Sequence, residues 1–107
     1  MSAALSSAPL RIVVADPVDG VVRVTVTGEV DTVSAGQLRA ALTGVAADPA
    51  VRGLVVDLTG VPFVAVAGLH PLLEASAAAE AGRRTMRVLA GPAGGVQGLL
   101  ERAGVLV

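Results

Sequence analysis

A run of apolar residues near the middle of the chain, "VRGLVVDL" from Val51 to Leu58, constrains the fold most strongly. The run is rich in branched side chains, and its only acidic residue is Asp57. Such a run is typical of a β-strand that is covered on both faces, as strands in parallel sheets are. We therefore expect an α/β fold in which helices pack on a sheet that contains this strand.

The residues before this run alternate between apolar and polar side chains with a period of two. Val22, Val24 and Val26 alternate with arginine and threonine, and a similar short stretch covers residues 10–15. The segment "ADPVDG" between them has the Asp, Pro and Gly residues of a turn. Residues 10–15 and 21–28 are therefore predicted to form a hairpin with one buried face.

Two helices are predicted around the central strand. In "DTVSAGQLRAALTGVAAD" the apolar residues recur at helical spacing, with Asp31 or Thr32 as the capping residue and Pro49 beyond the end. The second helix follows the central strand and should stop at Gly82, after about Ala81. Pro71 would remove a hydrogen bond if this helix began near residue 66, so we expect the helix to start close to residue 70 or to kink there.

The remaining elements complete a single domain with the order β-β-α-β-α-β-α. "TMRVLA" predicts a fourth strand, "GPAGG" a turn, and the spacing of apolar residues over 96–103 a last short helix. A length of 107 residues suits one domain, which we place at residues 10–107 after a loose tail at residues 1–9.

Composition excludes several functions. The net charge is −1, and the eight basic residues are all arginines that form no run, which argues against nucleic-acid or polybasic membrane binding. The chain has no cysteine, so disulfides and thiolate metal sites are excluded. The longest stretch without charge, 59–73, contains two prolines and is too short for a membrane span. The first residues lack the basic segment and long apolar run of a signal peptide.

The titratable residues do not suggest catalysis or a bound metal or cofactor. There is one histidine and no lysine, and no serine lies at a strand-to-helix elbow as a hydrolase nucleophile would. His70 is expected to cap a helix or to face solvent, rather than to act as a base. Asp57 is either an acceptor for backbone N–H groups in a turn or part of a binding cleft. We therefore expect no enzyme, no metal and no cofactor.

Three stretches together resemble the STAS domain, the fold of bacterial anti-anti-sigma factors. They are "VTVTGEVDTVSAGQLRAAL", "GLVVDLTGVPFV" followed by Gly68-Leu69, and "RVLAGPAGGVQGLLERAGV", and the resemblance extends from about residue 10 to 107. It implies a small mixed β-sheet with helices, cytoplasmic residence, and action through protein binding. In this family an anti-sigma factor of the kinase type binds near the loop before the second helix and phosphorylates a serine or threonine there. The added charge then breaks the complex.

That loop departs from the family pattern. The family typically reads Asp-Ser-Ser/Thr-Gly-Leu, whereas this chain reads Ala65-Val66-Ala67-Gly68-Leu69. The glycine and leucine are kept, but the acid and both hydroxyls are absent. The phosphoacceptor position matches Val66, which has no oxygen to phosphorylate.

We therefore expect a regulatory STAS-like domain that binds a protein partner, such as a kinase-type anti-sigma factor or a related switch protein, and cannot be phosphorylated at Val66. Neither nucleic-acid binding nor direct membrane insertion is expected. The alternative is a fixed structural subunit of a transporter or signalling scaffold, because an apolar loop suits a permanent interface. The expected contact residues are Glu29, Asp31, Thr32, Ser34, Ala65, Val66, Ala67, Gly68, Leu69 and His70.

Overall fold

Six elements follow one another along the chain in the computed structural model, which describes residues 9–61 and 66–91. They are β1 (Arg11–Val14), β2 (Val21–Thr27), α1 (Ala35–Ala46), β3 (Gly53–Gly60), α2 (Val66–Ala81) and β4 (Thr85–Ala90). The predicted order is confirmed up to the fourth strand. The predicted last helix, the turn at 92–95 and the tail at 1–8 lie outside the described residues, as do the side chains of residues 66 and 67.

The hairpin is confirmed, and a tight turn closes it. The backbone groups of Val18 and Val21 exchange two hydrogen bonds of 2.9 Å around Asp19 and Gly20. Both central residues have positive φ, 53° and 81°, which is the conformation of the two-residue turns that fit the twist of a hairpin. Asp-Gly is among the best sequences for this turn because glycine has no Cβ and aspartate tolerates the left-handed region.

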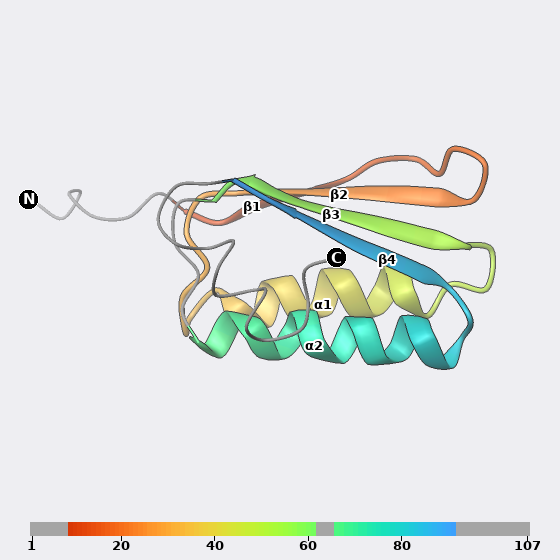
Figure 1. Cartoon of the computed structure of the whole chain (residues 1–107). Helices are drawn as coiled ribbons and strands as arrows, with labels where there is room; N and C mark the ends of the chain where they lie inside the picture. The colour runs from red at the N-terminus through yellow and green to blue at the C-terminus, as the bar shows by residue number, and fades with distance from the viewer. Residues whose placement is uncertain (1–8, 62–65, 92–107) are drawn as a thin grey trace, which may run out of the picture.

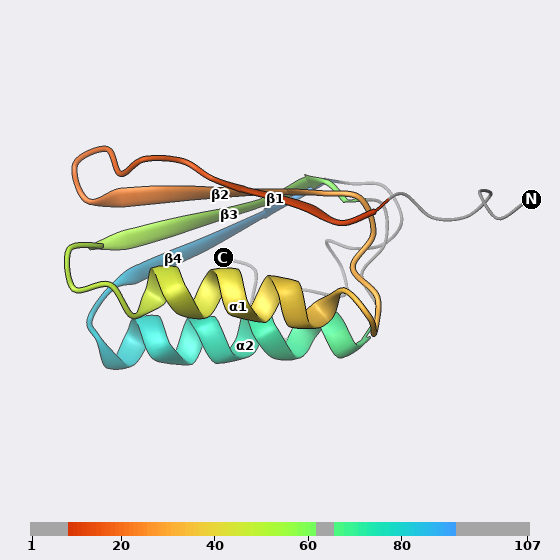
Figure 2. The same ribbon diagram turned by 180° about the vertical axis from the view of Figure 1, so that it is seen from behind.

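The four strands form one sheet in the order β1-β2-β3-β4. β1 pairs with β2 antiparallel, whereas β3 lies between two parallel neighbours. Figures 1 and 2 show that α1 and α2 lie side by side on the same face of this sheet. Both described helices therefore cover the same face of β3, and the expectation that the central strand is covered on both faces is wrong for this part of the chain. Leu54, Val56 and Leu58 of this strand point into the helical layer. Asp57 points to the other face, where it is buried among polar partners.

The core lies between the sheet and the two helices and is built from aliphatic side chains. Its fully buried members are Val24, Val26, Val30, Leu38, Leu42, Leu54, Val56, Leu58, Leu72 and Val88. The helical spacing that predicted the first helix is confirmed, since Leu38 and Leu42 are completely buried. None of the helices in residues 9–61 and 66–91 has the length and apolar character needed to cross a membrane.

The second helix begins earlier than expected. α2 starts at Val66, so Pro71 lies inside the helix and not in its first turn. The prediction of a start near residue 70 is wrong, because the local signal of the proline is outweighed by tertiary packing. The alternative, a kink of the helix at this position, stays a prediction. Pro71 and its neighbours Leu69 and Leu72 are buried, so the helix keeps its position despite one missing hydrogen bond.

Replacing Pro71 by alanine should stabilise the domain modestly, by less than about 1 kcal/mol. Alanine restores an N–H that can bond to the carbonyl of Ala67, but part of the buried ring surface is lost. Urea unfolding followed by circular dichroism measures the change as a shift of the midpoint at constant slope. A lower midpoint would mean that the packing of the ring contributes more than the missing hydrogen bond.

The end of α2 differs in detail from the expectation that Gly82 stops it. The helix ends at Ala81 as predicted, but the left-handed residue is Arg83, with φ of 60°. The N–H of Arg84 then bonds to the carbonyl of Ala79 at 2.7 Å, which closes the helix end.

Replacing Arg83 by glycine should raise the free energy of unfolding by about 0.5–1 kcal/mol. Glycine adopts the left-handed conformation without the Cβ penalty, although it has more freedom to lose on folding. A thermal melt of the variant against wild type measures the gain, and Arg83→Ala, which keeps the Cβ, is the matched control. Equal melting temperatures for the two variants would contradict the strain at this position.

Candidate functional site

The expected contact residues lie on two segments at one end of the domain. The connection 28–34 follows β2, and the start of α2 follows β3. Because β2 and β3 are parallel and Thr27 pairs with Gly60, both strands deliver their following segments to the same end of the sheet. This is the left-hand end in Figure 1.

A reciprocal pair of hydrogen bonds shapes the first segment. The backbone N–H of Ser34 donates to the carboxylate of Asp31 at 2.8 Å, and the N–H of Asp31 donates to the Ser34 hydroxyl at 3.0 Å. The carbonyl of Asp31 also accepts the N–H of Ala35 at 3.0 Å, so these bonds close a turn directly before the helix. The capping residue of α1 is Ser34, whose side chain makes no capping hydrogen bond. The prediction that Asp31 or Thr32 caps this helix is therefore wrong, because Asp31 holds the turn that leads into the helix.

The hydrogen bonds between Asp31 and Ser34 also affect the ionisation of the Asp31 carboxylate. Hydrogen bonds from the backbone N–H and then the hydroxyl of Ser34 hold the pKa of Asp31 below its ordinary value, so its carboxylate stays ionised at neutral pH. Glu29 is half-buried, and its main-chain carbonyl lies 3.2 Å from the Ser34 hydroxyl. Thr32 and Val33 are exposed at the tip, and Val33 exposes 89% of its surface. Val33 is not among the contact residues expected from the sequence.

The start of α2 supplies the second segment, and its residues differ in accessibility. Gly68 and Leu69 are buried, and Leu69 belongs to the core. His70 is exposed, which confirms the expectation that it faces solvent. Val66 and Ala67 form the first turn of the helix, while Ala65 lies outside the described residues. Of the described side chains in this segment, that of His70 is the one accessible to a partner.

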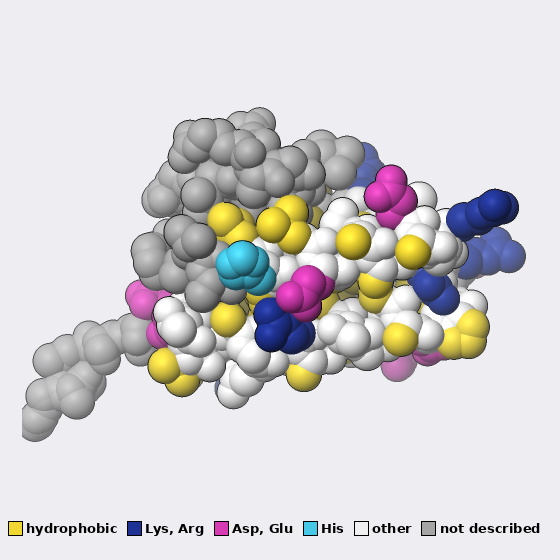
Figure 3. All heavy atoms as spheres, turned by 90° about the horizontal axis from the view of Figure 1, so that it is seen from below, with side chains coloured by type: hydrophobic (Ala, Val, Ile, Leu, Met, Phe, Trp, Pro, Cys, Tyr) yellow, Lys and Arg dark blue, Asp and Glu magenta, His cyan; other side chains and the backbone are white. Residues whose placement is uncertain are grey.

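The outer face of the two helices continues from this end. Figure 3 shows it with the histidine (cyan) near a contact between an acidic and a basic side chain. That contact joins the helices: Arg39 of α1 and Glu74 of α2 form a pair of N–O contacts of 3.0 Å each. Both side chains are about half exposed, so the pair contributes little to stability but fixes polar groups on this face.

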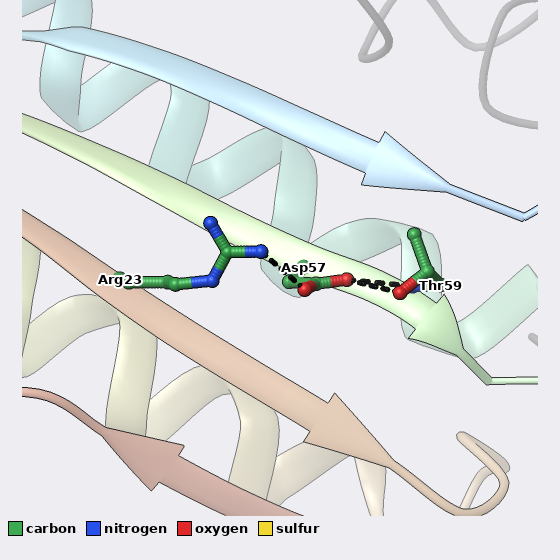
Figure 4. Close-up of polar contacts among 3 residues, drawn as sticks. All are labelled: Arg23, Asp57 and Thr59. Atoms are coloured by element: carbon green, nitrogen blue, oxygen red, sulfur yellow. Dashed lines mark hydrogen bonds and ion pairs between the residues drawn. The ribbon is translucent and has the colours of Figure 1, made fainter.

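A second polar cluster lies on the opposite face of the sheet, where neither α1 nor α2 packs. Figure 4 shows Arg23 of β2 and Thr59 of β3 on either side of Asp57. One carboxylate oxygen of Asp57 accepts the backbone N–H of Thr59 at 2.9 Å and its hydroxyl at 2.6 Å. The other oxygen accepts the guanidinium of Arg23 at 2.6 Å. The role of Asp57 as a turn acceptor is therefore confirmed, and the contact with Arg23 is an addition that the sequence did not predict.

The bonds from Thr59, and then the charge and hydrogen bond of Arg23, lower the pKa of Asp57 despite its burial. Both oxygens are occupied by partners from the sheet, so this carboxylate is structural. Within residues 9–61 and 66–91 no three carboxylate or histidine side chains come together as metal ligands would.

This arrangement, an antiparallel hairpin continued by two parallel β-α-β units, is similar to that of solved anti-sigma factor antagonists. The anti-sigma factor antagonist from Mycobacterium paratuberculosis is 36% identical to this chain and superposes with a TM-score of 0.74, over 92% of this chain and 83% of that one.

Two further structures support the fold. SpoIIAA in its unphosphorylated form matches with a TM-score of 0.74 and 19% identity, over 89% of this chain and 82% of that one. The Bacillus cell fate determinant SpoIIAA in the phosphorylated form gives 0.71 and 18%, over 89% and 85%.

The family model described as "Mlab, STAS domain" matches residues 14–106 of this chain. The chain therefore belongs to the STAS domain family, as its motifs suggested. No curated protein matches it significantly.

Proposed function

We propose that this protein is a cytoplasmic regulatory STAS domain that binds a protein partner of the anti-sigma factor type, without catalysing a reaction. The observation that carries the proposal is the 36% identity over most of the chain to an anti-sigma factor antagonist. The surface that we assign to the partner is formed by the segment Glu29–Ser34 and the start of α2, with His70 and Val33 as exposed side chains. Leu69 supports this surface from the core.

The difference from a switchable antagonist lies at residue 66. A phosphoserine there would add about −1.5 to −2 charge at the N-terminal end of a helix. Valine offers no acceptor oxygen, so we propose that the protein stays permanently in the state that corresponds to an unphosphorylated antagonist. The alternative function is that of a fixed subunit of a transporter or scaffold. The apolar sequence around residue 66 favours this alternative, because that sequence lacks the polar groups of a reversible switch.

Incubation with an anti-sigma kinase from the same genome and ATP should leave the intact mass of this protein unchanged, while complex formation persists. The variant Val66→Ser is the matched control: it should gain one phosphate and then lose binding. A natural substrate of the kinase verifies that the enzyme is active. Addition of a phosphate to wild type, for example at Ser34, Thr59 or Ser76, would overturn the permanent state. Failure of wild type and Val66→Ser to bind any such kinase would favour the fixed-subunit alternative.

A further inference from the structure

A pocket of about 270 Å³ lies at the end of the domain opposite to the proposed partner surface. It opens between the end of β1 and the last turn of α1, near the hairpin turn. The hairpin turn and the end of α1 lie at the right-hand end in Figure 1 and at the left-hand end in Figure 2. Val22 and Val45 contribute aliphatic surface to its lining. Val14, paired with the buried Val24, points to the helical side of the sheet, yet 48% of its surface remains exposed.

One helix position in the pocket lining lacks a side chain. Gly44 lines it, and a Cβ atom built at this position would meet no other atom within 4 Å. Helix α1 ends two residues later, at Ala46, and Val14 of β1 keeps about half of its surface exposed. A cavity of about 150 Å³ lined by aliphatic residues already admits benzene, so this pocket can accept a branched aliphatic side chain.

The rim of the pocket is negative. Asp16 and Asp48 both line it, and the carboxyl end of α1 adds the negative end of the helix dipole. The last turn of α1 contains no basic residue. The carboxylate of Asp48 accepts the N–H of Ala50 at 2.9 Å, whereas Asp16 makes no hydrogen bond or ion pair with the part of the chain that is described.

The guanidinium of Arg84, near the carboxyl end of α1, donates to two main-chain carbonyls, those of Val51 at 2.8 Å and Asp48 at 3.1 Å. These hydrogen bonds direct its donors at backbone oxygens. In the part of the chain that is described, the ion pairs are Arg23–Asp57 and Arg39–Glu74, so neither rim carboxylate belongs to one.

We propose that this pocket is a second protein-docking site, which accepts an aliphatic side chain next to an arginine or lysine in a partner segment. The aliphatic side chain would fill the space left by Gly44 and contact Val14 and Val45. The neighbouring cation would lie against Asp16 at the carboxyl end of α1, where opposite charge is favoured. The site is separate from the proposed partner surface, so a partner could occupy each end of the domain at once.

Titration of the isotope-labelled full chain with acetyl-leucyl-arginine amide, followed by NMR, tests the proposal. We expect amide shifts confined to the region of Val14, Asp16, Gly44 and Val45, with Kd on the order of 1 mM. Acetyl-leucyl-glutamate amide should bind at least about tenfold more weakly, because its charge is repelled by the rim. Equal affinity for the two peptides, or no shifts at tenfold the expected Kd, would overturn the proposal.

Two pairs of variants separate the pocket from general effects. Gly44→Leu should fill the pocket and abolish the shifts, whereas Gly36→Leu, at an equally open position at the other end of α1, should leave them unchanged. Asp16→Asn should weaken binding of the arginine peptide several-fold, whereas Asp19→Asn, in the adjacent turn, should not. A thermal melt verifies that each variant folds. Unaltered binding by a folded Gly44→Leu would place the site elsewhere.

Discussion

Replacing Asp57 by alanine should lower the free energy of unfolding by about 2 kcal/mol, more than a typical surface substitution does. The variant loses three hydrogen bonds at once and leaves Arg23 without its anionic partner on the sheet. The chain contains neither tryptophan nor tyrosine, so urea unfolding is best followed by far-ultraviolet circular dichroism. Thr59→Val, which removes only the hydroxyl contact, should cost less than half as much. A loss below about 0.5 kcal/mol for Asp57→Ala would mean that water replaces these partners at little cost.

The same carboxylate makes stability depend on pH. Because the folded-state pKa of Asp57 is lowered from 3.8, the unfolded chain binds this proton more readily than the folded one. The stabilisation is therefore complete above the ordinary pKa and is lost as pH falls through the lower folded-state value. Asp57→Asn should flatten the acid limb of the stability curve, and the remaining slope should include the contribution of Asp31, whose pKa is also lowered.

Replacing Gly28 by alanine should also cost about 2 kcal/mol or more, for a reason of backbone geometry. Gly28 has φ of 91°, and a Cβ there would clash with the carbonyl oxygen of Pro9. Alanine must therefore accept a strained conformation and also push the start of β1 away from the end of β2.

Gly36→Ala is the matched control for this substitution. A Cβ at Gly36 meets nothing within 4 Å, and the residue lies in α1, where alanine is favoured by up to about 1 kcal/mol. We therefore expect opposite shifts of the thermal midpoint for the two variants. Similar shifts would contradict the special role of Gly28.

Features that depend on neighbours in the sequence were predictable. The alternation of residues 21–28 and the pair Asp19-Gly20 specify a hairpin by themselves, because both the side-chain period and the positive φ values are local requirements. The capping residue of the first helix was not predicted correctly: Asp31 closes the turn before the helix, and Ser34 is the capping residue. The start of α2 was not predicted, because the burial of Pro71 depends on a sheet that the local sequence does not reveal.

The polar cluster and the site depend on pairing across the sheet. Arg23 and Asp57 are 34 residues apart, and only the parallel register of β2 and β3 brings them together. That register also places the two segments of the proposed partner surface at one end, which the sequence implied only through family resemblance. Hence the sequence could nominate residues for the proposed partner surface, but it could not show that Leu69 is buried while Val33 is exposed.

The hairpin turn at Asp19 and Gly20 also has a consequence for the order of folding. Only residues 15–20 separate its two strands, so they can pair in about 1–10 μs, before distant parts of the chain meet. Each parallel pairing must instead bring together strands separated by a whole helix, at a larger loss of chain entropy. We therefore expect β2 to be ordered early and to act as the template on which β3, and then β4, assemble.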